Sequence, residues 1–580
     1  MKQLVSRATI ANWQRLGNLH KQLLHRANKT DSKRLIFPEK YVENEQSKKN
    51  ILNLAAFVGD NSLKTDEFIL TLAGSVINKV ATISNTNKKR YLNSIQSQLG
   101  YAPTSFEVDS DLIKSILMEP DFFGGLFQTL KTEGTRNKNG LYYTPYYVAD
   151  DLLMKIKFDQ QQDFFDPGVG TGIFLVELLL KFNIPVAKLH GSDIDPIAAL
   201  LATANLLLHA PAFDNTYPDI QIKDYLQTKT SVKYSCIVGN PPWGAKNISA
   251  VNSSHFPKAD SFAYFLEKGL RELTTCGKLA FVLPVAFLNI ATHQPVRNLI
   301  LQDCSLESVT YLPNLFQGVI SDVVLVIIKK NRAPHNLVTF YKKGQIIETP
   351  QESYLHVPNE NLLPLKNIDL EIMHTIWQRK TVDLANSAWG LGIVTGNNKK
   401  HVLDAPTEQT EPIITGKEVQ PYVLKEARHF LNFQREKFQQ AAKNEIYRTP
   451  EKLVYKFINK RLVFAYDDQQ LLTLNSANIL VPHVLTHSVK TVMALLNSQL
   501  FQYLYAILFD SPKILRGNLQ ALPLIKLSKQ ESKFLEGLVE QQLTQQNKLA
   551  QIDDFVFTKY ALNHRQISRI HQVLTKGIFA

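Results

Sequence analysis

A glycine-rich segment in the second quarter of the chain reads Phe164-Phe165-Asp166-Pro167-Gly168-Val169-Gly170-Thr171-Gly172. A short apolar run precedes the glycines, and a helical pattern begins directly after them. Glycines at three alternate positions let a backbone turn tightly and approach a ligand closely. In open α/β sheets, ligands bind where such turns follow the strands. The segment therefore predicts a strand, a ligand-binding turn and a helix in succession.

The residue before the glycines, Asp166, indicates the charge of that ligand. Dinucleotide-binding turns have the spacing G-x-G-x-x-G and hold a pyrophosphate at the start of a helix, whereas the spacing here is G-x-G-x-G. A carboxylate would repel a pyrophosphate but would attract the ammonium group of S-adenosylmethionine. We expect this cofactor to contact Asp166, Gly168, Gly170 and Gly172. A tight turn that binds no ligand is the structural alternative.

Short apolar runs alternate with helical patterns from about residue 141 to 345. Strands are expected at 163–165, 188–192, 236–238, 278–283 and 323–328, and helices at 174–182, 196–209 and 261–273. This alternation is typical of a parallel sheet covered by helices on both faces. The predicted fold class is therefore α/β.

Acidic residues follow two further strands of this predicted sheet. Asp193 and Ile194 come after one strand, and a carboxylate there suits both hydroxyls of a ribose. Asp224 and Tyr225 come after the apolar run at 220–222, which suits a hydrogen bond and an aromatic contact to adenine. Taken singly, Asp193 is equally well explained as a helix cap and Asp224 as a loop residue. Together they favour a nucleoside pocket.

A second motif, Asn240-Pro241-Pro242-Trp243, follows the strand expected at 236–238. Its prolines stiffen the backbone and remove two N–H donors. The Asn240 amide oxygen and the Pro241 carbonyl can then accept both hydrogens of one amino group. Trp243 offers an aromatic face on which an extruded base can stack. The motif predicts methyl transfer to the amino nitrogen of a base, and Asn240 is expected to contact the cofactor as well. The alternative is a strand-ending turn with a packed tryptophan.

The composition limits the class of protein. The 580 residues are too many for one core, and the net charge of +13 permits a polyanionic partner. The chain holds three cysteines without a CxxC pair, so we expect neither a metal site nor disulfides, and a cytoplasmic location. The longest apolar run, 279–290, is too short for a membrane span.

The motifs occupy only the middle of the chain. Before them, periodic apolar positions at 51–58, 68–80 and 112–118 predict an N-terminal helical region, 1–130. The catalytic domain is expected at 131–345. After residue 346 the strands become short, and 529–578 is helix-prone, so a third region is expected at 346–580.

In their order, these motifs resemble those of amino-group DNA methyltransferases of the gamma class. The resemblance rests on Asp166 to Gly172, Asp193-Ile194-Asp195-Pro196, Asp224 and Asn240 to Trp243, and it covers about residues 135–530. It implies a Rossmann-like methyltransferase domain followed by an α+β target-recognition domain. The fourth residue of the catalytic motif is more often Tyr or Phe in that class, and Trp243 can stack equally well.

The resemblance adds residues that the pattern alone does not supply. Gly140-Leu141-Tyr142-Tyr143-Thr144-Pro145 is similar to the motif that wraps the methionine part of the cofactor, so Tyr142, Thr144 and Pro145 are expected there. Leu315-Phe316 is similar to the segment whose aromatic ring forms the far wall of the base pocket, which implies a catalytic role for Phe316.

The function implied is methylation of adenine N6 in double-stranded DNA after the base is flipped out, by a type II restriction–modification methyltransferase. Asn240 favours adenine, because enzymes acting on cytosine N4 more often have Ser there. A separate endonuclease is expected, since the first 130 residues offer no convincing nuclease set, and a monomer is expected. The alternatives are methylation of RNA or of a protein glutamine, and a specificity subunit that binds DNA without catalysis.

Overall fold

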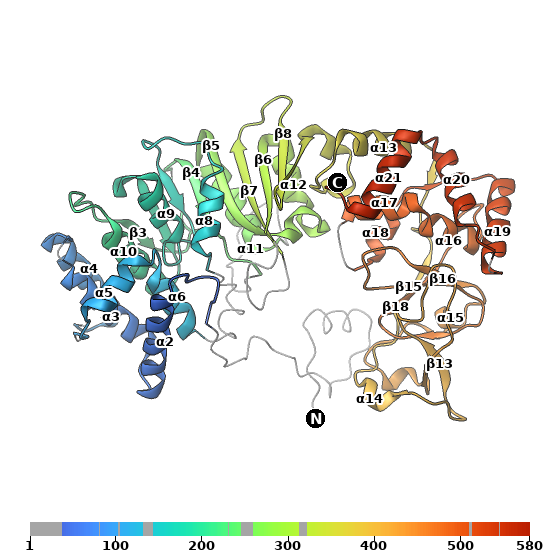
Figure 1. Ribbon diagram of the computed structural model, residues 1–580, viewed down its shortest axis with the longest axis horizontal. Helices are drawn as coiled ribbons and strands as arrows, with labels where there is room; N and C mark the ends of the chain where they lie inside the picture. The colour runs from blue at the N-terminus through green and yellow to red at the C-terminus, as the bar shows by residue number, and fades with distance from the viewer. Residues whose placement is uncertain are drawn as a thin grey trace. The chain divides into compact units, whose positions relative to one another are not determined.

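The computed structural model describes residues 37–80, 82–102, 105–131, 143–229, 231–244, 259–312, 322–509, 513–544 and 546–579 (Figure 1). These described residues divide into two compact units. The first unit runs through Ile346 and includes Pro350–Leu362; it contains the predicted catalytic domain and is called the catalytic unit for that reason. The C-terminal unit comprises Ile347–Thr349 and the chain from Leu363.

A nine-stranded sheet, counted over the described residues, forms the centre of the catalytic unit in the order β3-β2-β1-β4-β5-β7-β6-β8-β9. Its strands are β1 Phe164–Asp166, β2 Leu189–Asp193, β3 Asp219–Ile222, β4 Tyr234–Gly239, β5 Leu273–Pro284, β6 Cys304–Leu312, β7 Val323–Lys330, β8 Leu337–Lys342 and β9 Gln345–Pro350. All five predicted strands are confirmed. The expectation of an all-parallel sheet is wrong, because β7 runs antiparallel to β5 and β6.

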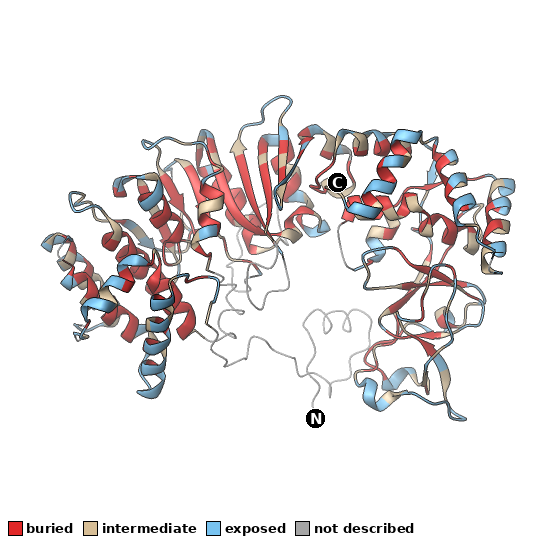
Figure 2. Cartoon of the chain, viewed as in Figure 1, coloured by how far each residue is buried: buried red, intermediate tan, exposed pale blue. Residues whose placement is uncertain are grey.

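The predicted helices between the strands are also confirmed. They are α9 Ile173–Phe182, α10 Pro196–His209 and α11 Ser261–Glu272, joined by α8 Tyr146–Leu153 and α12 Gln294–Asp303. α10 starts where it does because Asp195 accepts hydrogen bonds from the free N–H groups of Ile197 and Ala198, and Pro196 opens the first turn. β1 is buried at all three residues. β4 and β7 are buried along most of their length, as Figure 2 shows.

The helices before the sheet share a core with α10. They are α2 Glu45–Asp60, α3 Thr65–Lys79, α4 Asn85–Leu99, α5 Ser110–Met118 and α6 Phe122–Leu130. Their buried side chains form one cluster with Leu201, Leu207 and Leu208 of α10. α10 is therefore covered by the N-terminal helices on one side and packs on β2 and β3 on the other.

The C-terminal unit is α+β. Two small sheets, β11-β18-β15-β16 and β12-β14-β13-β17, contain strands β11 Ala388–Gly390, β12 Val402–Leu403, β13 Glu411–Ile414, β14 His429–Leu431, β15 Lys452–Lys456, β16 Phe464–Asp467, β17 Leu472–Thr473 and β18 Ala477–Val481. The longer helices are α13 Asn367–Trp377, α16 Val489–Asn497, α17 Gln499–Phe509, α19 Lys529–Leu543, α20 Leu549–Tyr560 and α21 His564–Lys576. The short elements are β10 Thr381–Val382, α14 Asn398–His401, α15 Asn444–Tyr447, α18 Arg516–Gln520 and β19 Leu524–Ile525.

Buried ion pairs join elements within this unit. Lys452 Nζ of β15 lies 2.6 Å from Asp467 Oδ2 of β16, and both side chains are fully buried. Arg569 of α21 binds Asp369 of α13, with 2.8 Å between Nε and Oδ1. No described helix alone has the length and apolarity of a membrane span; α16 and α17 reach both only when taken together, and the chain bends by 63° between them.

Candidate active site

The glycine loop connects β1 to α9 and is shaped by its own hydrogen bonds. Gly172 N–H donates to the Val169 carbonyl at 2.8 Å, which closes the turn. Gly170 and Gly172 have φ values of +54° and +95°, which disfavour residues with a side chain. A Cβ on Gly172 would also lie 3.2 Å from Cβ of Ala202, so glycine lets α10 pack closely against the loop.

Asp166 ends β1 beneath this loop and is only 1% exposed. Its Oδ1 accepts from Gly168 N–H at 3.0 Å, whereas no described residue donates to its Oδ2. Burial, partly offset by the Gly168 N–H and reinforced by the charge of Asp193, raises its pKa to about 8. A buried acceptor without a donor is costly. The arrangement fits a ligand that brings an ammonium group, and S-adenosylmethionine has one.

Asp193 connects the glycine loop to the loop after β2. Its carboxylate accepts from Gly170 N–H at 2.8 Å and from Asp195 N–H at 2.9 Å, and burial raises its pKa. The next side chain, Ile194, is 70% exposed although it is apolar. The expected sugar-binding carboxylate and its apolar neighbour therefore lie at the edge of the loop that contains Gly170.

The residues after β3 lie beside the same strand ends. Lys223 N–H donates to the Asp193 carbonyl at 2.9 Å, and Asp224 Oδ1 accepts from Leu226 N–H at 3.0 Å. The Tyr225 ring is buried, with its centroid 5.6 Å from that of Phe165 and 5.4 Å from that of Phe265. Its contact with the adenine of a cofactor stays a prediction.

The segment predicted to be catalytic, Asn240–Trp243, lies against the glycine loop. A Cβ on Gly239, the last residue of β4, would lie 2.6 Å from Asp166 Oδ1. A Cβ on Gly168 would lie 3.9 Å from Cδ of Pro242. The structure therefore brings Asp166, Gly168 and the start of the Asn240–Trp243 segment together, and Trp243 is 9% exposed.

The start of α11 fixes this segment in place. Asp260 Oδ1 accepts from Gly244 N–H at 2.7 Å, and Ser261 Oγ donates to the Pro242 carbonyl. Sequence reasoning missed these two residues and Phe265, whose Cε1 would lie 3.9 Å from a Cβ on Gly168. The signal was present, because Asp and Ser directly before an apolar helical pattern are typical of a helix start.

The structure describes only some of the residues expected to wrap the methionine part of the cofactor. Thr144 is 2% exposed, Pro145 is the residue before α8, and Tyr143 Cε1 would lie 3.2 Å from a Cβ on Gly170. Two predicted residues, Tyr142 and Phe316, lie outside the described residues.

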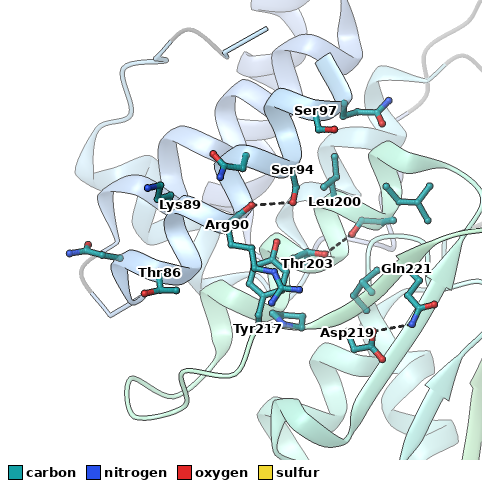
Figure 3. Close-up of a pocket in the computed structure, with 17 residues that line it drawn as sticks. Thr86, Lys89, Arg90, Ser94, Ser97, Leu200, Thr203, Tyr217, Asp219 and Gln221 are labelled. Carbon is teal, nitrogen blue, oxygen red and sulfur yellow. Dashed lines mark hydrogen bonds between the residues drawn. The ribbon is translucent and has the colours of Figure 1, made fainter. Parts of the chain in front are cut away.

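A separate hollow of about 1050 Å³ lies between α4, α10 and β3 (Figure 3). Most of the residues that line it are polar, and Arg90 lies over the Tyr217 ring at 4.0 Å from the centroid. None of the predicted cofactor or catalytic residues lines it. The hollow is therefore distinct from the candidate site and does not mark the cofactor pocket.

Two family models match the chain. Residues 119–396 match the N-6 DNA Methylase family, and residues 411–524 match the TaqI-like C-terminal specificity domain. The first match contains the glycine loop, the acidic residues and the Asn240–Trp243 segment.

Similar proteins are found among curated sequences and solved structures. The type II methyltransferase M.VspI of Vibrio sp. (strain 343) is 28% identical over 333 residues, which cover 54% of this chain and 78% of that protein. M.CvrRI of Paramecium bursaria Chlorella virus XZ-6E, also named a type II methyltransferase, is 24% identical over 286 residues, covering 48% and 68%. The type IIL restriction–modification enzyme MmeI, solved in complex with DNA, has the same fold, with a TM-score of 0.59, 13% identity and 99% coverage of both chains.

Proposed function

We propose that this chain, which matches the N-6 DNA Methylase family and then the TaqI-like C-terminal specificity domain, methylates adenine N6 in double-stranded DNA. The methyl donor is S-adenosylmethionine. The role is protection of a specific DNA site from a separate restriction endonuclease, by a monomer in the cytoplasm.

The observation that carries this proposal is the closeness of two loops. The residue before Asn240 approaches the Asp166 carboxylate so closely that a Cβ would be 2.6 Å from it, and Pro242 lies over Gly168. A ligand held by Asp166 and the glycine loop would therefore lie next to the Asn240 side chain. Methyl transfer needs this proximity, because donor and acceptor must be aligned within about 3–3.5 Å.

The chemistry is divided between the cofactor and the chain. S-adenosylmethionine supplies an electrophilic methyl group on sulfur. Asn240 Oδ1 and the Pro241 carbonyl accept hydrogen bonds from the adenine amino group, which makes its lone pair available. The Ser261 bond to the Pro242 carbonyl and the Asp260 bond to Gly244 N–H hold these acceptors in a fixed geometry. Fixed dipoles of this kind act without reorganisation during the reaction.

Adenine must leave the helix to reach these acceptors, which costs a few kcal/mol. We propose that stacking on Trp243, and on Phe316 from the opposite side, offsets this cost. Tyr142, Thr144 and Pro145 are proposed to enclose the methionine part of the cofactor, while Asp193, Ile194, Asp224 and Tyr225 surround its nucleoside.

The specificity domain is proposed to read the DNA site. Cationic side chains of the C-terminal unit are proposed to contact phosphates and base edges: Lys399, Lys400, Lys417, Lys456, Lys460 and Arg461, all exposed except the half-buried Lys456. RNA and protein glutamine are less favoured substrates, because a specificity domain follows the methylase domain. A non-catalytic subunit is less favoured because the sequence retains the glycine loop and Asn240–Trp243.

The test is the variant Asn240→Ala. We expect it to retain S-adenosylmethionine binding, measured by titration calorimetry, and to lose at least about 100-fold in methyl transfer to duplex DNA. The control is Asn93→Ala, an exposed asparagine on α4, which should behave as the wild type. Methylated adenines are mapped by long-read sequencing of DNA from expressing cells. Full turnover of the Asn240 variant, or methylation confined to RNA or protein, would overturn the proposal.

A further inference from the structure

Helix α6 lies between the N-terminal helices and the two loops of the proposed cofactor site. All nine of its residues, Phe122–Leu130, are buried. Asp121 stands before its first residue and Lys131 after its last. Each of these two charged side chains reaches a different loop of the site.

Asp121 holds the glycine loop. Its Oδ2 accepts hydrogen bonds from the hydroxyls of Thr171 and Tyr41. Its Oδ1 accepts from Gly124 N–H at 2.7 Å and from Asn205 Nδ2 at 2.6 Å. Asp121 is 3% exposed, and these donors are all neutral. A buried carboxylate with no cation has to be compensated by several such bonds.

Thr171 is fixed through two of its groups. Its hydroxyl donates to Asp121, and its carbonyl accepts from Asn205 Nδ2 at 2.8 Å. Thr171 stands between Gly170 and Gly172, both at positive φ. Because glycine has no Cβ, the backbone on either side of Thr171 is conformationally permissive. Anchoring the residue between them restricts the loop before any ligand arrives.

Lys131 holds the second loop. Its Nζ lies 2.8 Å from Asp195 Oδ2 and 3.7 Å from the centroid of the Phe127 ring. The side chains of Lys131 and Asp195 are 15% and 24% exposed, so solvent screens this pair only in part. Asp195 N–H in turn donates to Asp193, the carboxylate proposed to bind the ribose.

We propose that α6 preorganises the cofactor site, with Asp121 acting through Thr171 as a positioning residue for S-adenosylmethionine. The inference rests on the proposed function. Ordering a loop on binding opposes affinity, and a loop that is already ordered avoids this loss. The N-terminal helices thus contribute to cofactor affinity without touching the cofactor.

The test compares two replacements of Thr171 in the full chain. Thr171→Val keeps the shape but removes the hydroxyl, whereas Thr171→Ser keeps the hydroxyl. We expect Thr171→Val to raise the Kd for S-adenosylmethionine about tenfold, which corresponds to one lost hydrogen bond to a charged group. Thr171→Ser should stay near the wild type, and kcat at saturating cofactor should change much less than Kd.

The matched control is Thr129→Val on α6 itself. The Thr129 hydroxyl is equally buried but donates to the Gly125 carbonyl at 2.8 Å, away from the loops. Its removal should lower the melting temperature about as much as Thr171→Val while leaving Kd unchanged. Hydrogen exchange of the amides at 168–172 should accelerate only in Thr171→Val.

The pair is tested by a double-mutant cycle. Asp121→Asn places an amide against the Thr171 hydroxyl, and its effect on Kd should not add to that of Thr171→Val. Equal Kd values for Thr171→Val and the wild type, or additive effects in the cycle, would overturn the role proposed for α6. If the wild type binds S-adenosylmethionine but does not methylate DNA, only the proposed function fails, because the role of α6 is measured by the Kd.

Discussion

Asp166 has an unusual environment for a carboxylate. It is 1% exposed, it accepts one hydrogen bond from Gly168, and Asp193 adds negative charge nearby. Burial is the main cause of a pKa raised to about 8. Below that pH the apoprotein carries a neutral carboxyl group here, whereas the proposed ammonium of the cofactor needs the charged form.

Because the cofactor's ammonium group needs the ionised form of Asp166, the affinity for S-adenosylmethionine should depend on pH. Because ammonium binding favours the ionised carboxylate, binding releases a proton below pH 8. The Kd for S-adenosylmethionine should therefore fall as pH rises from 6 to 7.5, by at most about tenfold per pH unit. Titration calorimetry of Asp166→Asn should give weak binding without this slope. Asp111→Asn, which changes an exposed carboxylate on α5, is the control and should keep it.

The Asp166 carboxyl group affects folding stability in the opposite direction: stability falls as pH rises, whereas cofactor affinity increases. Its pKa is raised above 3.8, so the folded apoprotein binds an extra proton between about pH 4 and 8. Its contribution to stability is present in acid and is lost as pH rises toward 8. The free energy of unfolding, measured by chemical denaturation, should therefore depend on pH differently in the wild type and in Asp166→Asn. The same pH dependence in both proteins would contradict the raised pKa of Asp166.

At the scale of elements, the end of β4 shows how two motifs constrain each other. Gly239→Ala would force its Cβ to within 2.6 Å of Asp166 Oδ1, so either β4 or the carboxylate must shift. We expect the catalytic unit to lose about 1–3 kcal/mol of stability, by overpacking, and cofactor affinity to fall with it. Gly59→Ala in α2 has no atom within 4 Å of its Cβ and should be neutral or slightly stabilising. Chemical denaturation measures both.

The elements differ in how well the sequence predicts them. β4, β5 and β7 contain continuous apolar runs, β1 and β2 stand directly before the glycine loop and the loop that contains Asp195, and all five strands are found where they were expected. β6 was missed because Ser305, Glu307, Ser308 and Thr310 interrupt its apolar pattern, although most of these residues are buried. Antiparallel pairing of β7 with β5 was missed as well, because strand direction depends on connections that local patterns do not encode.

The candidate site was predicted where its residues are close in sequence. The glycine loop and Asn240–Trp243 are local patterns, whereas the bond from Thr171 to Asp121 joins residues 50 positions apart. Nothing around Asp121 distinguishes it from an ordinary helix cap. Asp260 and Ser261 were detectable as a helix start, but their bonds to the catalytic segment depend on how α11 packs.

At the scale of the whole molecule, the described chain divides into two compact units, each with its own core. We therefore expect calorimetry to resolve two unfolding transitions. S-adenosylmethionine at about 100 times its Kd should stabilise only the catalytic unit, by about 2.7 kcal/mol. A single transition, or an equal shift of both, would contradict this prediction.

The buried ion pair of Lys452 and Asp467 allows the unfolding transition of the C-terminal unit to be shifted separately. Lys452 Nζ also donates to the Tyr447 carbonyl at 2.8 Å. Lys452→Met would leave Asp467 buried without its cation, and we expect this to destabilise the C-terminal unit by about 3–5 kcal/mol. The other transition and its response to cofactor should not move.

The core that α10 shares with the N-terminal helices has a practical consequence for building chimeras with new DNA specificity. A crossover near residue 130 would strip Leu201, Leu207 and Leu208 of their partners and yield an insoluble hybrid. A crossover between Leu362 and Leu363 exchanges all of the C-terminal unit except Ile347–Thr349, so donor specificity modules should be grafted there.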